Sequence, residues 1–233
     1  MADVAANYQT ILQRINEAAL KSGRDPKEVR LLAAAKSQNV ELIHAAVAAG
    51  VALIGENYVK EAQGKKSQIR APIEWHMIGH LQRNKAKAAA EIFDLIESLD
   101  SAALARELDR AGKERGKKIR VFVELNLAAE ESKSGIAKHK VADLLKAVGD
   151  LSHVSVEGLM AVPPFRENPG DVRPYFRELN EIRAKLQDLN IPGITLKELS
   201  MGMTHDYPVA VEEGATIVRI GTALFGPRQS GAR

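Results

Sequence analysis

The chain of 233 residues contains no cysteine, so it can form neither disulfides nor thiolate metal sites, and it has no cysteine nucleophile. This is expected of a protein that works in a reducing compartment, which points to the cytoplasm. Aromatic residues make up only 4% of the sequence and leave little material for stacking on nucleic-acid bases. The 33 basic residues outnumber the 30 acidic ones by too few to favour a polyanionic partner.

Long apolar runs are missing as well. Residues 1–14 lack the basic segment followed by an apolar run that a signal peptide needs, and no later stretch approaches membrane-spanning length. The hydrophobic content of 45% is ordinary for a globular protein and sufficient for a full core. The composition therefore predicts a soluble cytoplasmic domain with no nucleic-acid or membrane partner.

Short apolar runs typical of strands alternate along the chain with segments of helical periodicity. An amphipathic helix over residues 3–21 comes first and ends at Gly23. Eight strand-like runs follow, at 31–35, 51–55, 74–78, 92–99, 120–126, 154–162, 197–201 and 216–220. Between them lie helical segments at 39–49, 58–68, 82–90, 101–115, 138–149, 171–189 and 205–213.

Strands that alternate with helices predict a parallel sheet with right-handed crossovers. Eight such strands favour a closed (β/α)₈ TIM barrel over an open doubly wound sheet. No linker or change of composition divides the chain. We therefore expect a single α/β domain over residues 1–233, with the helix of residues 3–22 packed on the barrel and a tail at 229–233.

Lys36 ends the first predicted strand, which is rich in alanine. An ammonium group is costly to desolvate unless it is used, and burial lowers the pKa of a lysine toward a nucleophilic range. Such a lysine can form a Schiff base with a carbonyl compound. The alternative is a lysine whose aliphatic stem carries its charge to solvent. A barrel favours the first role, because its functional residues lie where strands end.

Glycine and a hydroxyl side chain follow each of the last two predicted strands. They are Ser200 with Gly202 and Gly221 with Thr222. Glycine lets backbone N–H groups approach an anion closely, and the hydroxyl adds a donor. Barrels commonly hold a phosphate in the loops after strands seven and eight. Each pair is also compatible with an ordinary turn.

Arg219 lies within the last strand, where a charge is unusual. It is either a core arginine paired to a buried carboxylate, for which Glu56 and Glu198 are available, or a permanent donor aimed at a ligand. Other polar strand ends have simpler roles. Asp100 and Asn126 are expected to cap the helices that follow them.

His76 and His80 lie four residues apart, a spacing that shares one face only on a helix. This stretch is predicted to be a strand that runs into a turn, and the HExxH motif is absent. We therefore predict no metal site. His76 is expected in the core, and His80 in a loop near the cleft.

A lysine, a phosphate cradle and an aligned donor together describe a pyridoxal 5′-phosphate site. The aldehyde would meet Lys36, the phosphate would meet Ser200 and Gly221-Thr222, and the pyridine nitrogen would meet Arg219. An arginine does not protonate that nitrogen, so the ring would stay a poor electron sink.

Motifs spread from Ala34 to Gly226 carry a family resemblance. They are Ala34-Ala35-Lys36, Gly55-Glu56-Asn57-Tyr58-Val59-Lys60-Glu61, Trp75-His76-Met77-Ile78-Gly79-His80-Leu81-Gln82-Arg83-Asn84-Lys85, Lys133-Ser134-Gly135, Gly158-Leu159-Met160, Leu199-Ser200-Met201-Gly202-Met203-Thr204 and Val218-Arg219-Ile220-Gly221-Thr222-Ala223-Leu224-Phe225-Gly226. In this order they resemble the pyridoxal phosphate homeostasis protein family, whose barrel is similar to the N-terminal domain of bacterial alanine racemase.

The resemblance implies that Lys36 carries the internal aldimine and that Asn57 lines the ring. It implies phosphate contacts from Ser200 and the Gly221-Thr222 loop, with Arg219 at the pyridine nitrogen. It also implies a monomeric, non-catalytic carrier that acts in intracellular vitamin B6 homeostasis and delivers the cofactor to apoenzymes.

Two positions depart from the family pattern. Ala35 stands where the family often has serine, and Gln38 stands where it often has a second lysine. A transfer role for that second position is therefore not expected in this chain, whereas the role of Lys36 is unaffected.

The alternative function is a pyridoxal-phosphate-dependent amino-acid racemase. Two-base racemisation needs a second acid–base group on the opposite face of the substrate. In alanine racemase a tyrosine from a separate C-terminal domain supplies it, and this chain ends at Arg233 without such a domain. Of the four tyrosines only Tyr58 and Tyr207 follow strand ends. The expected lack of the second domain favours the carrier.

Overall fold

The computed structural model describes residues 3–128, 130 and 134–227. Lys133 of the Lys133-Ser134-Gly135 motif and the predicted tail at 229–233 lie outside the described residues.

Eight parallel strands form a closed barrel, as the sequence predicts. They follow the order β4-β3-β2-β1-β9-β8-β7-β5, and pairing of β4 with β5 closes the ring. Their bounds are β1 Arg30–Ala34, β2 Leu53–Glu56, β3 Glu74–Met77, β4 Leu95–Leu99, β5 Ile119–Asn126, β7 Val154–Ala161, β8 Ile194–Met203 and β9 Ile217–Ile220. The two-residue strand β6, Ile136–Ala137, adds to the end of β5. It was not predicted, because two residues show no periodicity.

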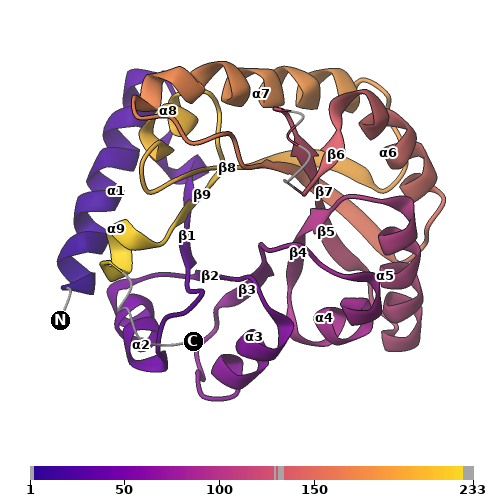
Figure 1. Cartoon of the computed structure of the whole chain (residues 1–233), viewed down its shortest axis with the longest axis horizontal. Coiled ribbons are helices and arrows are strands. Elements are labelled where there is room, and N and C mark those ends of the chain that lie inside the picture. Colours follow the sequence, from indigo (N-terminus) through magenta and orange to yellow (C-terminus); the bar gives the residue numbers. More distant parts are fainter. Residues whose placement is uncertain (1–2, 129, 131–133, 228–233) are drawn as a thin grey trace.

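Helices surround the strands as an outer ring (Figure 1). Their bounds are α1 Val4–Lys21, α2 Val40–Ala49, α3 Val59–Lys66, α4 Ala86–Ile92, α5 Ala102–Arg115, α6 Val141–Gly149, α7 Arg173–Gln187, α8 Tyr207–Glu212 and α9 Thr222–Phe225. Single 3₁₀ turns occur at Pro26–Glu28, Arg83–Lys85, Lys138–Lys140 and Pro169–Val172. None of the helices in the described ranges is both long and apolar enough to cross a bilayer.

Helix α1 precedes the first strand and packs against α9, the helix that follows the last strand. It contacts α2, α8 and α9, and in Figure 1 the indigo helix lies beside the yellow α9. Asn7 on α1 donates a hydrogen bond to the carbonyl oxygen of Leu224 on α9 at 2.9 Å. This contact ties the first helix to the loop region that follows the last strand.

The barrel interior and the space between strands and helices form separate apolar clusters. The interior layer contains Leu32, Leu53, Leu95, Phe122, Met160 and Ile217, with Ile78 packed on it. Because strand side chains alternate between two faces, residues two positions later point into the barrel as well. On β1 and β9 these are Ala34 and Arg219, which therefore line the space above the apolar layer.

Ion pairs fill the barrel on the other side of the apolar layer, toward the N-terminal ends of the strands. Arg30 lies 3.0 Å from Glu198, and Arg120 lies 2.9 Å from Glu157 and 3.5 Å from Glu74. These charged groups pair with one another at the end of the barrel opposite Ala34 and Arg219.

Candidate functional site

A cavity of about 360 Å³ opens at the C-terminal ends of β1, β8 and β9. Five of the six residues predicted for the site line it, namely Lys36, Asn57, Arg219, Gly221 and Thr222. The wall also contains Ala34, Gln38, Ile78, Val162, Met203, Thr204 and His205. Residues separated by more than 180 positions in the sequence thus face one space.

Closure of the barrel brings Lys36 and Gly221 to the same cavity. Strand β1 pairs with β9 in parallel, with Leu32 opposite Arg219 and Ala33 opposite Ile220. The turn after β1 and the loop after β9 therefore leave the sheet side by side. Lys36 stands in the first of these segments and Gly221 in the second.

Arg219 is held in one orientation by its neighbours. Its Nη1 donates to the carbonyl oxygen and to the Oγ of Ser200, both at 2.7 Å, and its Nη2 donates to the carbonyl oxygen of Ala161 at 2.8 Å. The side chain is almost fully buried, and this burial lowers its pKa. A guanidinium still stays charged in proteins. Arg219 therefore presents a fixed positive charge at the floor of the cavity.

Ser200 is the one predicted site residue that the structure does not bring to the cavity wall. It is fully buried, and its Oγ donates to Glu97 Oε2 at 2.5 Å while accepting from Arg219. In this position the hydroxyl orients the arginine. The strand end after β8 reaches the cavity instead through Met203 and Thr204.

The carboxylate closest to Arg219 is Glu97 on β4, 3.8 Å from Nη1. The two partners that the sequence suggested are wrong, because Glu198 pairs with Arg30 and Glu56 pairs with Lys65. Glu97 lies across the barrel from β9, and only the closed ring brings these strands face to face.

His76 is buried in the core, as predicted, and links two carboxylates. Its Nδ1 lies 2.7 Å from Glu97 Oε1, and its Nε2 lies 3.3 Å from Glu74 Oε2. Burial alone would lower the pKa of His76, but the bonds to Glu74 and Glu97 outweigh it and raise the pKa. Burial, the largest single influence on Glu97, would raise its pKa, but the hydrogen bonds from His76 and Ser200 and the positive charges of His76 and Arg219 together outweigh it and lower the pKa. His76 and Glu97 thus form a buried, hydrogen-bonded pair.

Glu124 on β5 is a buried carboxyl that sequence reasoning missed. Within the described part of the chain its Oε2 has no hydrogen-bond partner. Burial raises its pKa to about 7, although the positive charge of Arg219 opposes the rise. A single glutamate in an apolar strand carries no local signal that its carboxyl group will be buried without a hydrogen-bond partner.

His205 and Thr204 also reach the cavity without having been predicted for the site. The ring of His205 lies 5.3 Å from that of Phe165, and its Nε2 lies 3.0 Å from the carbonyl oxygen of Glu167. Thr204 Oγ1 accepts a hydrogen bond from the Ala223 N–H at 3.2 Å. Both follow Gly202, which adopts the left-handed φ of 90°. That glycine was the available signal for a loop turning toward the cavity.

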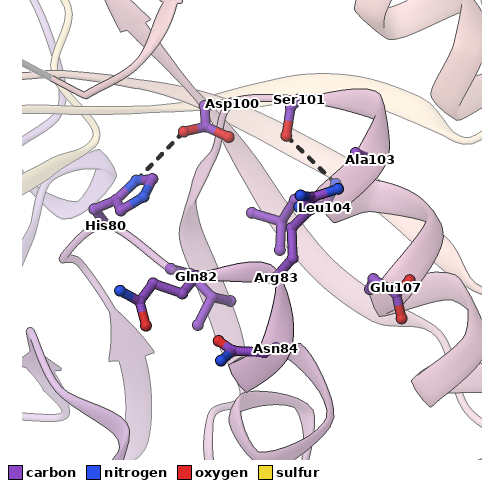
Figure 2. Close-up of a pocket in the computed structure, with 10 residues that line it drawn as sticks. His80, Gln82, Arg83, Asn84, Asp100, Ser101, Ala103, Leu104 and Glu107 are labelled. Carbon is purple, nitrogen blue, oxygen red and sulfur yellow. Dashed lines mark hydrogen bonds and ion pairs between the residues drawn. The ribbon is translucent and has the colours of Figure 1, made fainter.

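A second cavity of about 830 Å³ lies over the ends of β3 and β4 (Figure 2). His80 Nδ1 lies 3.4 Å from Asp100 Oδ2 at its edge. Asp100 is not the cap of α5, contrary to the prediction, because the next residue, Ser101, caps it by accepting the Leu104 N–H. The residues that line this cavity include no lysine, so it offers no amine to a carbonyl ligand.

Asn126 is not a helix cap either. Its Nδ2 donates to the carbonyl oxygen of Glu130 at 2.8 Å, and its Oδ1 accepts the Glu130 N–H at 3.3 Å. The side chain therefore closes a loop after β5. Across the described residues, no three histidine, aspartate or glutamate side chains gather in a way that could hold a metal ion.

Comparison with known proteins places these features in a family. The model of the alanine racemase N-terminal domain matches residues 4–229. The chain is 42% identical over 220 residues to the pyridoxal phosphate homeostasis protein of Aquifex aeolicus, covering 94% of this chain and 96% of that one. It is 40% identical over 233 residues to the protein of the same name from Pseudomonas aeruginosa, covering 100% and 99%.

Solved structures agree in fold. PipY of Synechococcus elongatus with pyridoxal phosphate bound superposes with a TM-score of 0.81 at 37% identity, covering 93% of this chain and 100% of that one. Alanine racemase of Clostridium difficile 630 superposes with a TM-score of 0.75 at 13% identity, covering 97% of this chain and 56% of the racemase. The second likeness concerns the fold alone.

Proposed function

The chain belongs to the pyridoxal phosphate homeostasis protein family, and we propose that it binds pyridoxal 5′-phosphate on Lys36 and acts in the intracellular homeostasis of this cofactor. The observation that carries the proposal is the single cavity shared by Lys36, Arg219 and the Gly221-Thr222 loop. An amine, a fixed cation and a glycine-containing loop in one small space match the aldehyde, ring and phosphate of this ligand.

The residues present fit the cofactor. When bound, pyridoxal phosphate supplies an aldehyde that a lysine amine can convert to an imine with loss of water. Lys36 is the amine in the cavity wall, and Asn57 and the small Ala34 line the same cavity. Arg219 supplies a donor and positive charge, and Gly221 lets the backbone approach an anion.

A binding role fits these residues better than catalysis. The Arg219 guanidinium is anchored to Ser200 and Ala161 and cannot pass a proton to a ring nitrogen at ordinary pH. Strong carbanion stabilisation would need an acidic partner there. We therefore propose that the protein stores the cofactor reversibly and delivers it to apoenzymes. We also propose that it acts as a monomer in the cytoplasm, a reducing compartment that suits the cysteine-free composition.

Replacing Lys36 tests the proposal directly. We expect purified protein saturated with pyridoxal phosphate to show the visible absorption of an imine, and Lys36→Ala to abolish it. Lys113→Ala, which removes an exposed lysine of α5, is the matched control and should keep the band. A band that persists unchanged in Lys36→Ala would mean that another lysine holds the cofactor.

His205 is the observation that favours a second candidate function, that of an amino-acid racemase. It is the one imidazole that lines the cavity, and it could serve as a second acid–base group beside Lys36. Incubating the cofactor-loaded protein with L-amino acids in deuterated water separates the two functions. We expect negligible α-deuteration. Rapid deuteration with racemisation, lost in His205→Ala, would establish the racemase and contradict the carrier.

A further inference from the structure

The turn that carries Lys36 is held from outside the cavity by two side chains of α3. Glu61 Oε1 accepts the Ser37 N–H at 2.7 Å, and Lys65 Nζ donates to the Ala35 carbonyl oxygen at 2.8 Å. These are the peptide groups on either side of Lys36. We call the pair Glu61 and Lys65 the α3 clamp.

The two members of the clamp also hold each other. Lys65 Nζ donates to Glu61 Oε1 at 2.7 Å, across the one helical turn that separates residues four apart. Its third hydrogen bond goes to Glu56 Oε1, also at 2.7 Å. All three ammonium hydrogens are therefore used. Lys65 is buried and does not line the cavity, so its contacts are with the turn and with carboxylates.

The backbone that the clamp holds is an unusual one. The Gln38 N–H bonds to the Ala35 carbonyl oxygen at 3.0 Å, which closes a β-turn with Lys36 and Ser37 at its centre. Ser37 has φ of 62°, in the left-handed region that glycine occupies freely and a serine does not. The Ser37 N–H that Glu61 accepts belongs to this strained residue.

We propose that the α3 clamp is a positioning device that keeps the Lys36 turn in its left-handed form and so aims the amine into the cavity. This inference rests on the proposed function, because it concerns how Lys36 meets a carbonyl ligand. Without the clamp, Ser37 can relax to a right-handed conformation, and the Lys36 stem then leaves the sheet in a different direction. If the amine is then in place for only about a tenth to a hundredth of the time, the apparent affinity for a ligand that must react with it falls by the same factor.

The first test compares two ligands in Glu61→Ala, with Gln63→Ala, an exposed residue of the same helix, as control. Pyridoxal phosphate requires the Lys36 amine, whereas pyridoxamine 5′-phosphate has no aldehyde and cannot condense with it. We expect affinity for pyridoxal phosphate to fall roughly tenfold to a hundredfold. Affinity for pyridoxamine phosphate should stay within about twofold, and equal losses for both ligands would overturn the proposal.

Ser37→Gly provides the rescue. Glycine adopts the left-handed turn without needing the clamp, so Glu61→Ala/Ser37→Gly should recover most of the lost affinity for pyridoxal phosphate. Ser37→Gly alone should bind like the unchanged protein. A double variant as weak as Glu61→Ala would show that Glu61 acts otherwise than through the turn.

Amide hydrogen exchange tests the clamp without any cofactor. The Ser37 amide should exchange slowly in the unchanged protein and at least tenfold faster in Glu61→Ala, since it then loses its acceptor. The exchange rate of the Ala62 amide, which bonds to the carbonyl oxygen of Tyr58 at the start of α3, should not change. Equal Ser37 exchange in both proteins would overturn the clamp. If the unchanged protein showed no imine band, the proposed function would be overturned. The clamp would then still be decided by the exchange rate of the Ser37 amide.

Discussion

Single residues inside the barrel form a continuous chain of hydrogen bonds and charges. It runs from Glu74 through His76, Glu97 and Ser200 to Arg219 at the cavity. The Ser200 hydroxyl links Glu97 to Arg219, and the two charged groups lie 3.8 Å apart, so the buried guanidinium has a carboxylate partner. The chain explains why an arginine can occupy the last strand of a barrel core. It also explains why Ser200 is turned away from the cavity.

Glu124 stands outside this chain, and its protonation should be visible in the stability of the protein. Its pKa is about 7 in the folded state, against an ordinary value of 4.5. The folded state therefore binds more protons than the unfolded state between these values. Stability from this residue is present below pH 4.5 and is lost as the pH rises toward 7, by up to about 3 kcal/mol.

Glu124→Gln removes this titration. We expect the variant to gain up to about 3 kcal/mol relative to the unchanged protein between pH 4.5 and pH 8, measured by urea unfolding of the cofactor-free proteins. Glu56, whose pKa burial also raises to about 7, titrates in both proteins and cancels in the difference. Gln63→Ala, which changes an exposed, uncharged side chain of α3, should show the same pH dependence as the unchanged protein. A difference that does not vary with pH would refute the role assigned to Glu124.

At the scale of elements, the loops after β2 and β3 approach each other closely. A Cβ placed on Gly79 would lie 2.7 Å from the Asn57 carbonyl oxygen and 2.8 Å from its Cα. Both are backbone atoms, which cannot swing aside as a flexible side chain can. Gly79 therefore lets Asn57 occupy its place in the cavity wall while the next loop passes behind it.

Gly79→Ala should destabilise the protein by about 1–3 kcal/mol, because the two loops must move apart. Gly64→Ala offers a control of opposite sign. Gly64 lies within α3, and a Cβ there would meet no atom within 4 Å. Since alanine is the better helix former, this variant should be more stable by about 0.5–1 kcal/mol. Urea unfolding measures both, and a Gly79→Ala protein as stable as the unchanged one would contradict the close packing.

At the scale of the whole molecule, closure of the barrel makes the site. Strand β1 lies between β2 and β9, so the turn after the first strand adjoins the loops after the second and the last. Lys36, Asn57 and Thr222 meet for this reason. A sheet in which each strand paired only with its neighbours along the chain would leave β1 without β9.

The sequence by itself determined the barrel and five of the twelve residues that line its cavity. Apolar periodicity and helix caps are local, so all eight barrel strands could be located, and with them the strand ends that carry Lys36 and Gly221. The left-handed turn at Ser37 had no such signal, because serine shows no preference that would reveal it. Short elements such as β6 and α9 were also missed, because segments of two to four residues show no periodicity.

Only the tertiary structure decided which side chains meet. Arg219 pairs with Glu97 rather than with Glu56 or Glu198, and Ser200 serves that arginine rather than the cavity wall. These choices depend on strand register, barrel closure and the direction of each side chain, which are set by contacts between residues far apart in the chain. A pattern along the sequence indicates which strand a residue belongs to. The fold decides which side chain from another strand that residue contacts.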